Sequence, residues 1–258
     1  MKKILFQIVL LGLTLGACET IEERNELGPK VTKDQIDINV IQEPEGSNTI
    51  ILENNTEKII PYWDWGTGWS NAHNDTIYIP FGGDYSLEFT AFSQGGSTTV
   101  TREFTIAEND EDYFTTDPAW YGLTDNGEGK TWVWATDHPS GSLAGNGPED
   151  CVTPAWWIMA PSDYWGSTTD EVYMDLDGAA NFKHTAGDGS VTTGVFKVIE
   201  PFEFNGESFS AFEVLGGPTF PWPTTGKYHI THMNEDELSI HAYGAYDVAL
   251  YKRKGFSY

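Results

Sequence analysis

Apolar and polar residues alternate with a period of two along most of this chain. The clearest runs are "TIYIPF", "YSLEFTAF", "EVYMDL", "SAFEVL", "KYHIT" and "ELSIHA". Successive side chains of a strand point to opposite faces, whereas an amphipathic helix needs apolar residues at i, i+3 and i+4. After the first 18 residues no long stretch has the helical spacing, and glycine-rich turns such as "SQGGS" and "AGDGS" separate the runs. This pattern predicts an all-β protein.

The first residues have the three-part layout of a secretory signal. Lys2 and Lys3 precede an apolar run over residues 4–15, which is too short to span a bilayer, and small residues follow. The sequence "LGAC" ending at Cys18 resembles a bacterial lipobox. That resemblance implies cleavage of a signal peptide at residues 1–17 and lipidation of Cys18. The alternative is an ordinary signal peptide followed by a chance cysteine.

An acidic segment follows Cys18, with the sequence "ETIEERNE". It resembles the surface-export signal of Bacteroidetes lipoproteins, and the alternative is a solvated linker. We expect residues 18–33 to form a flexible acidic tether. The resemblance implies a protein anchored by lipid in the outer membrane and facing the cell exterior.

Charge and cysteine content limit the ligands and the stabilising bonds. The chain has 14 Lys and Arg against 39 Asp and Glu, a formal net charge of −25, and two cysteines. Such a chain repels phosphate backbones and anionic lipids, so nucleic acid is excluded and polyanionic glycans are disfavoured. Neutral ligands or cations such as Ca²⁺ remain. If Cys18 carries lipid, Cys151 has no disulfide partner.

A domain boundary is predicted near residues 107–118. The segment "AENDEDYFTTDP" is acidic, contains a proline and separates two sets of predicted strands. We therefore expect one domain over residues 34–107 and a second over residues 118–258. Each is long enough to bury its own hydrophobic core.

The first domain resembles the PKD family of immunoglobulin-like domains. Its sequence "YWDWGTGWS" is similar to the family pattern Trp-x-Phe-Gly-Asp-Gly, with Trp65 in place of Phe and Thr67 in place of Asp. A Gly-x-Tyr strand at Gly83 and a final strand at 99–106 complete the match. The resemblance implies a β-sandwich that acts as a spacer or a minor binding module.

Three tryptophans in this stretch divide between core and surface. Trp63 and Trp65 share one face of the predicted strand, and we expect that face to be the core. Trp69 follows the turn glycines without alternation, so we expect an exposed ring. In the same domain, Asp75-Thr76-Ile77 resembles the acceptor triplet for O-glycosylation in Bacteroidetes, which makes Thr76 a candidate modification site.

The second domain has several tryptophans in its first part, within residues 129–166, and predicted antiparallel strands at its C-terminal end. The segment from residue 226 onward looks like the last strands of lipocalin-like domains in Bacteroidetes lipoproteins. The whole chain resembles lipoproteins of polysaccharide-utilisation systems, which implies other proteins of such a system as partners. We expect a larger antiparallel β-barrel or β-sandwich, lipocalin-like or carbohydrate-binding-like.

Aromatic side chains on loops of this domain are candidates for stacking on sugar rings. Trp222 lies between prolines in "PTFPWPTTG", and Trp165 follows Tyr164 in a Gly/Ser loop. The apolar face of a sugar ring can stack on an aromatic face. The alternative is that these rings fold back to cap the domain. Trp156 and Trp157 are adjacent on a predicted strand, so we expect one in the core and one on the surface.

Sequence motifs for catalysis or metal binding are weak. The chain contains no His-Glu-x-x-His, no Gly-x-Ser-x-Gly and no distinctive carboxylate pair. His229 and His232 are three apart on a predicted strand and make a poor metal pair. Cys151 near His138 could form a nucleophile–base pair, but a single spare cysteine is more often inert. The segments "MDLDG" and "NGEG" could hold Ca²⁺, although Asp177-Gly178 is also an ordinary hairpin turn.

These features favour a non-catalytic surface lipoprotein that binds a neutral oligosaccharide or polysaccharide without a cofactor. The candidate contacts are Trp222, Trp165, Tyr164 and Trp69. Two alternatives stay open. One is a glycoside hydrolase with an unrecognised carboxylate pair, and the other is a structural or partner-docking lipoprotein. An exposed Trp165 beside Trp222 favours binding, facing carboxylates favour the hydrolase, and fully buried aromatics favour docking.

Overall fold

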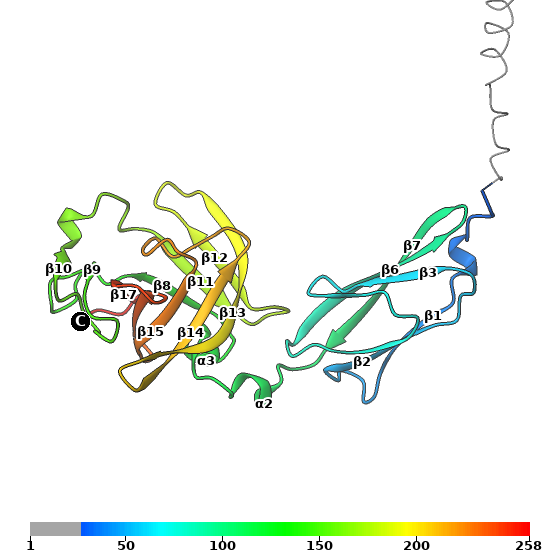
Figure 1. The fold of residues 1–258 in the computed structure, drawn as a ribbon, viewed down its shortest axis with the longest axis horizontal. Coiled ribbons are helices and arrows are strands. Elements are labelled where there is room, and N and C mark those ends of the chain that lie inside the picture. The colour runs from blue at the N-terminus through cyan, green and yellow to red at the C-terminus, as the bar shows by residue number, and fades with distance from the viewer. Residues whose placement is uncertain (1–26) are drawn as a thin grey trace, which may run out of the picture.

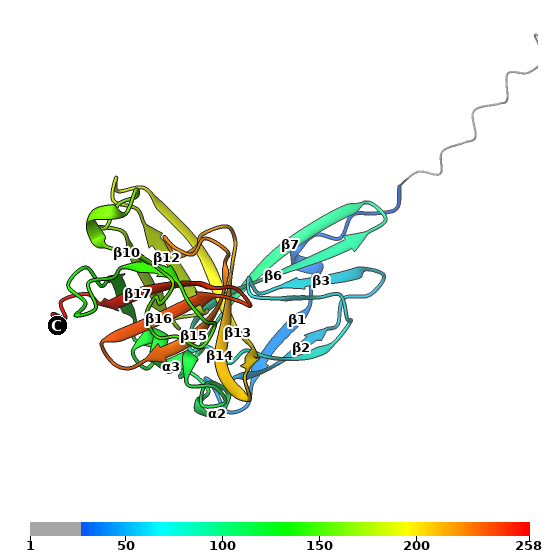
Figure 2. The same cartoon turned by 60° about the vertical axis from the view of Figure 1, so that its left-hand side comes forward.

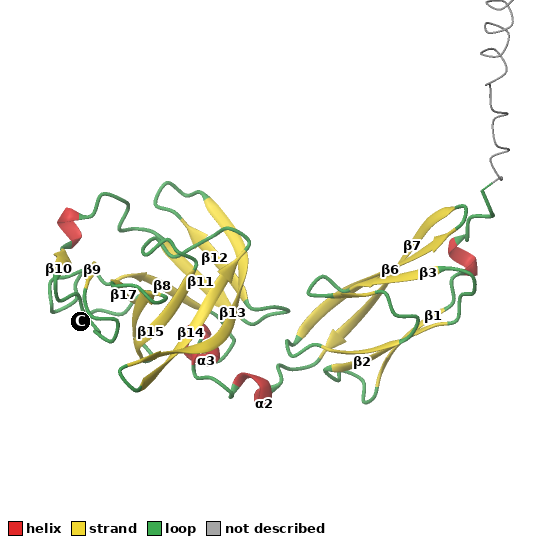
Figure 3. Cartoon of the chain, viewed as in Figure 1, coloured by secondary structure: helices red, strands yellow, loops and turns green. Residues whose placement is uncertain are grey.

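The chain folds into a β-sandwich and a β-barrel joined by a short helical connection, in a computed structural model that describes residues 27–258 (Figure 1). The predicted signal peptide, Cys18 and most of the acidic tether lie outside the described residues. The elements are almost entirely strands (Figure 3), so the prediction of an all-β protein is confirmed.

Two antiparallel sheets form the sandwich. One has the strand order β1-β2-β5 and the other has the order β4-β3-β6-β7. Their bounds are β1 (Ile38–Gln42), β2 (Thr49–Asn54), β3 (Ile60–Asp64), β4 (Trp69–Ser70), β5 (Asp75–Tyr78), β6 (Gly83–Ser93) and β7 (Gly96–Ile106), preceded by the 3₁₀ turn η1 (Lys33–Gln35). This arrangement is an immunoglobulin-like sandwich, as the sequence resemblance implies.

The sandwich core is built from alternate residues of its strands. Trp63 is fully buried and packs against Phe89 with ring centroids 4.3 Å apart. Its Nε1 donates a hydrogen bond to the Ala72 carbonyl oxygen at 3.0 Å, so the buried indole has a partner. Trp65 packs partly buried against the same core. A Cβ at Gly68 would lie 2.6 Å from the Trp65 ring, so that ring requires a glycine there.

Two short helices connect the domains. Asp110 caps α2 (Glu111–Phe114), where its side chain accepts from the backbone amides of Asp112 and Tyr113. The next helix, α3 (Ala119–Thr124), buries Trp120 and Leu123 in the core of the barrel. Within residues 27–258 no helix is long and apolar enough to cross a membrane.

Eight antiparallel strands close the second domain into a barrel (Figure 2). Their order is β17-β16-β15-β14-β13-β12-β11-β8, and β17 pairs with β8 to close the ring. The bounds are β8 (Lys130–Trp134), β11 (Glu171–Asp175), β12 (Asn181–Thr185), β13 (Val191–Phe204), β14 (Glu207–Leu215), β15 (Lys227–Met233), β16 (Glu237–Ala242) and β17 (Asp247–Arg253). Two further strands, β9 (Ala144–Asn146) and β10 (Trp157–Met159), extend from β17, and η2 (Pro161–Asp163) follows them.

Aromatic side chains fill the barrel interior. Trp132 and Trp134 alternate along β8 and both point inward, where they are fully buried. They share one core with other buried rings of the domain, Phe182, Phe212, Phe220, Tyr228 and Tyr251. The Tyr228 hydroxyl accepts from the amides of Phe220 at 3.1 Å and Gly226 at 3.2 Å. The barrel therefore has a packed core.

Candidate functional site

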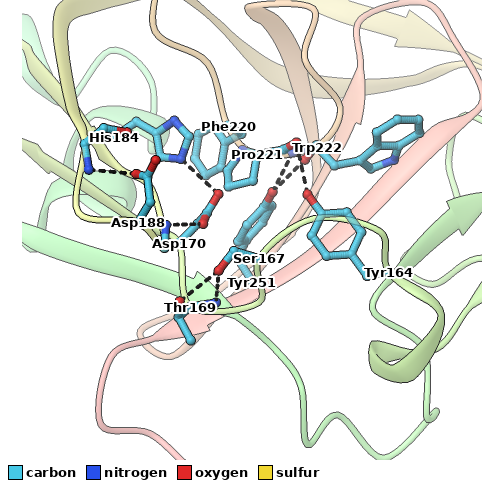
Figure 4. A network of polar contacts seen from close by, with 12 residues as sticks. Tyr164, Ser167, Thr169, Asp170, His184, Asp188, Phe220, Pro221, Trp222 and Tyr251 are labelled. Atoms are coloured by element: carbon cyan, nitrogen blue, oxygen red, sulfur yellow. Dashed lines mark hydrogen bonds and ion pairs between the residues drawn. The ribbon is translucent and has the colours of Figure 1, made fainter.

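Three of the predicted ligand contacts meet beside the barrel core. Tyr164 and Trp165 come from the loop after η2, and Trp222 comes from the loop between β14 and β15. Figure 4 shows Tyr164 beside Trp222. The Trp165 and Trp222 rings lie 5.6 Å apart at an interplanar angle of 88°. Tyr164 and Trp165 lie 5.6 Å apart at 44°. We refer to Tyr164, Trp165 and Trp222 as the loop aromatic cluster.

A buried tyrosine fixes the backbone of Trp222. The Tyr251 hydroxyl donates to the Trp222 carbonyl oxygen at 2.6 Å and accepts from the Trp222 amide at 3.3 Å (Figure 4). The Tyr251 ring in turn stacks on Trp134 at 4.7 Å. Burial raises the pKa of the Tyr251 hydroxyl well above its usual value, so the group stays protonated and can donate. The packed core of the barrel therefore holds the backbone of Trp222, one member of the loop aromatic cluster, in place.

The members of the cluster differ in exposure. The exposed fraction of Trp165 is 68%, whereas Trp222 and Tyr164 are half-buried against the barrel core. Within the described chain, Nε1 of Trp222 is buried without a hydrogen-bond partner. Trp165 therefore offers an open ring face, and Trp222 meets that ring edge to face instead of extending it into one flat platform.

Hydrogen bonds order the loop that carries Trp165. Asp170 accepts from the Gly187 amide at 2.7 Å through one oxygen and contacts Nε2 of His184 at 3.2 Å through the other (Figure 4). The Ser167 and Thr169 hydroxyls pair at 2.8 Å. The sequence analysis did not find Asp170 or His184, because they meet across the β11–β12 hairpin and lie 14 residues apart in sequence. Both carboxylate oxygens of Asp170 are occupied by these structural contacts.

Trp69 lies in the other domain and does not join the loop aromatic cluster. It is exposed on β4 of the sandwich and neighbours Tyr62, with ring centroids 5.9 Å apart. The sequence analysis missed Tyr62, although its position next to the buried Trp63 places it on the outer face of the strand. Thr76, the candidate modification site, is exposed on β5 at the edge of its sheet.

The prediction that one of Trp156 and Trp157 is buried is wrong. Both rings are exposed. The strand β10 is three residues long and lies at the end of the extension from β17, outside the closed barrel. Trp156, which precedes this strand, lies beside the exposed Tyr246 with ring centroids 5.2 Å apart.

Cys151 does not pair with His138. Its Sγ lies 3.8 Å from Nε2 of His241, while Nδ1 of His138 contacts the Ser140 hydroxyl at 2.7 Å. Burial raises the pKa of the Cys151 thiol to about 11, so the thiol stays protonated and is a poor nucleophile. His229 and His232 are also apart: His229 is buried, and His232 lies beside Glu237 at 3.5 Å.

The segments proposed to hold Ca²⁺ form turns. In "MDLDG", Oδ1 of Asp175 accepts from the Asp177 amide at 3.1 Å and from Nδ2 of Asn181 at 2.6 Å, which leaves a hairpin turn before β12. Across residues 27–258 no three His, Cys, Asp or Glu side chains are grouped to hold a metal ion.

Comparisons with known proteins do not identify a family for this chain. No protein-family model matches the sequence, and no curated protein matches it significantly. Among solved structures, the PKD1 domain of Vibrio anguillarum Epp is similar, with 16% identity and a TM-score of 0.25. The match covers 28% of this chain and 92% of that domain. At that TM-score the match carries no argument, and the assignment of an immunoglobulin-like sandwich rests on the two sheets themselves.

Proposed function

We propose that the barrel binds a neutral oligosaccharide or polysaccharide at the loop aromatic cluster and does not turn it over. The observation that carries the proposal is the meeting of Trp165, Tyr164 and Trp222 from two separate loops. The Trp165 ring is exposed to solvent. Its neighbour Trp222 is held by hydrogen bonds between its backbone and the Tyr251 hydroxyl. A ring held in place before binding loses little conformational entropy when a sugar stacks on it.

The strength of such a contact predicts the size of the ligand. A sugar ring has about a dozen heavy atoms, and ordinary ligands gain roughly 0.3 kcal/mol per atom. One ring therefore contributes on the order of 3 to 4 kcal/mol, which corresponds to millimolar affinity or weaker. Useful affinity needs several sugar rings bound together. The hydroxyls of Ser167 and Thr169 beside the cluster are suitable partners for the hydroxyls of a longer chain.

The carboxylates near the cluster support binding without hydrolysis. A glycosidase needs two carboxyl groups that flank the scissile bond. Both oxygens of Asp170 hold the loop, and Oδ1 of the nearby Asp188 accepts from the Ser190 amide at 2.8 Å. Asp170 and Asp188 therefore act as structural acceptors in this loop region.

The location of the protein is a second part of the proposal. We infer that Cys18 carries lipid and that the acidic tether presents the protein on the outside of the outer membrane, as in polysaccharide-utilisation lipoproteins. The support is the sequence "LGAC" with the acidic segment behind it. A Cys18→Ala chain that is still acylated and membrane-bound in cell fractionation contradicts this inference.

The decisive experiment compares two exposed tryptophans by calorimetric titration. Trp165→Ala is expected to weaken binding of a neutral oligosaccharide of four or more units by about 1 to 2 kcal/mol. Its melting temperature is expected to stay unchanged because the ring is exposed. Trp222→Ala is a poorer test, since Trp222 packs against the barrel core and its removal also lowers stability.

Trp156→Ala is the matched control, since Trp156 is an exposed ring of the same domain. We expect this variant to bind like the wild type. The proposal fails if no neutral glycan binds the wild type, or if Trp156→Ala and Trp165→Ala weaken binding equally.

A further inference from the structure

The outer face of the β4-β3-β6-β7 sheet carries a second set of aromatic residues. Their positions follow from the strand register. Ile60 of β3 pairs with Phe92 of β6, and Asp64 of β3 pairs with Trp69 of β4. Tyr62 lies between them on β3 and faces outward with them, because the intervening Trp63 is buried. We call Ile60, Tyr62, Trp69 and Phe92 the sheet aromatic face.

This face is open and unusually apolar for a solvent-facing sheet. Ile60 is 67% exposed, Trp69 62% and Phe92 46%. Burying such side chains would be favourable, and contiguous exposed apolar groups mark interaction sites. The planes of Tyr62 and Trp69 are within 24° of each other. The two rings therefore present similar orientations to a ligand that lies along the sheet.

Hydroxyls and carboxylates surround these rings. The register places Thr90 of β6 beside Thr99 of β7, with their Oγ1 atoms 2.8 Å apart. Other outward positions of the two strands hold Ser86, Ser97, Thr101, Glu88 and Glu103. The positions of β3, β4, β6 and β7 that share this face contain no Lys or Arg. Such groups can donate to and accept from sugar hydroxyls.

The charge of the face selects the class of ligand. Its ionisable groups are carboxylates, so an anionic peptide, a polyanionic glycan or a phosphate group is repelled. A second copy of this chain is also disfavoured, because each copy has a formal net charge of −25. A neutral ligand with both apolar ring faces and many hydroxyls fits the mixture of rings, hydroxyls and carboxylates.

We propose that the sheet aromatic face is a binding site for a neutral polysaccharide, separate from the loop aromatic cluster. The five residues from Ile60 to Asp64 span about 13 Å of β3, since a strand rises by about 3.3 Å per residue. That span exceeds one sugar ring, so the face binds a polymer chain lengthwise across several sugars. The sandwich is then a second binding module and not only a spacer. This proposal does not require the barrel to bind sugar.

The test is affinity electrophoresis of the purified protein through gels that contain a soluble β-glucan, xylan, mannan or α-glucan. Trp69→Ala and Tyr62→Ala are each expected to raise the dissociation constant for the retarding polymer at least tenfold. Their melting temperatures are expected to match the wild type. Trp156→Ala is the control, because Trp156 has the same exposed fraction of 62% and lies in the barrel domain.

Trp165→Ala in the same gels separates this proposal from the proposed function of the barrel. If Trp69→Ala loses retardation and Trp165→Ala does not, the sheet site stands and the barrel site fails. If Trp165→Ala alone loses it, the sheet site is overturned. If the wild type and all variants migrate like an inert marker protein in every gel, both binding proposals are overturned.

Light scattering on the same samples tests a protein ligand. If the wild type is an oligomer and Trp69→Ala is a monomer with unchanged retardation in the gels, the sheet aromatic face is an interface between copies. That outcome overturns the glycan proposal.

Discussion

Trp63 and Trp69 show how strongly the position of a single residue decides its role. They are six residues apart, yet Trp63 is fully buried and Trp69 is largely exposed. Trp63 sits on the inner face of β3, and its indole nitrogen has a backbone acceptor. Trp69 pairs with the outward Asp64 instead. The same residue type therefore stabilises the fold at one position and is free to contact a ligand at the other.

Trp63→Ala is expected to lower the free energy of unfolding by about 3 to 5 kcal/mol, because it leaves a cavity where the ring packs on Phe89. Trp69→Ala is expected to change it by less than about 0.5 kcal/mol, as for most exposed positions. Urea denaturation of the two variants measures both values. A large loss for Trp69→Ala would mean that its ring supports the fold.

Exposure at Thr76 bears on the proposed O-glycosylation. The side chain is exposed on an edge strand, where an enzyme can reach it. Asp75, the first residue of the triplet, accepts from the Thr76 amide at 2.8 Å and from the Ser70 hydroxyl. Modification of Thr76 remains a proposal. Peptide mass spectrometry of protein from its native host decides it, and a fully unmodified Thr76 peptide contradicts it.

At the scale of elements, the loop between β9 and β10 is held by two buried histidines. Nε2 of His229 donates to the Glu149 carbonyl oxygen at 2.7 Å, and Nε2 of His241 donates to the Cys151 carbonyl oxygen at 2.8 Å. The two imidazoles stack at 4.9 Å, and Phe202 covers the other side of His229 at 4.2 Å. Within the described chain neither Nδ1 atom has a hydrogen-bond partner.

Acid is expected to weaken this arrangement. Burial is the main cause that lowers the pKa of His229 from 6.5 to about 4; the hydrogen bond to Glu149 opposes this shift, and the neighbouring His241 adds to it. Burial also lowers the pKa of His241, although the carboxylates of Asp150 and Asp247 oppose the shift. The unfolded chain therefore binds more protons than the folded chain between about pH 4 and 6.5, and stability falls as the pH falls through that window.

The expected loss from His229 alone is on the order of 3 kcal/mol between pH 7.5 and pH 4. Denaturation curves over this pH range measure it. His229→Gln keeps a donor near the Glu149 carbonyl oxygen and does not titrate, so its stability is expected to depend less on pH. An equally steep pH dependence in His229→Gln would assign the effect to other groups.

Elements with local sequence signals were predictable, and those that depend on distant partners were not. Alternation located β6 and β11 because burial alternates along each strand. It also located β14 and β16, although β16 is buried along most of its length. The helices α2 and α3 were missed because four and six residues are too short to show a helical period. The anchoring of the β9–β10 loop was also missed, since it joins Cys151 to His241, 90 residues away.

The candidate sites follow the same rule. Loop composition singled out Trp165 and Trp222 as exposed candidates, but it could not show that their rings meet 57 residues apart in sequence. Closure of the barrel, which no local pattern encodes, brings the two loops together. The exposure of both Trp156 and Trp157 likewise depends on β10 lying outside the closed ring of strands.

At the scale of the whole molecule, two hydrogen bonds and one apolar side chain join the sandwich to the barrel. The Gly178 amide, in the turn between β11 and β12, donates to the Gly82 carbonyl oxygen at 2.8 Å. The Tyr85 hydroxyl donates to the Gly178 carbonyl oxygen at 2.8 Å. Phe81 packs against the cores of both domains. If both proposed sites bind one polysaccharide, these contacts fix the distance between them, and a fixed distance favours simultaneous binding when it matches the ligand.

Gly83→Ala is expected to separate the two domains without unfolding either. A Cβ at Gly83 would lie 3.0 Å from the Gly178 backbone, and the φ of +142° at Gly83 is itself unfavourable for alanine. The turn between β11 and β12 must then move away. Small-angle scattering is expected to show a larger radius of gyration. Gly66→Ala is the control, because Gly66 also has positive φ but has no atom within 4 Å of the added Cβ. Equal radii for Gly83→Ala and wild type would show that Phe81 and the helical connection suffice to hold the domains together.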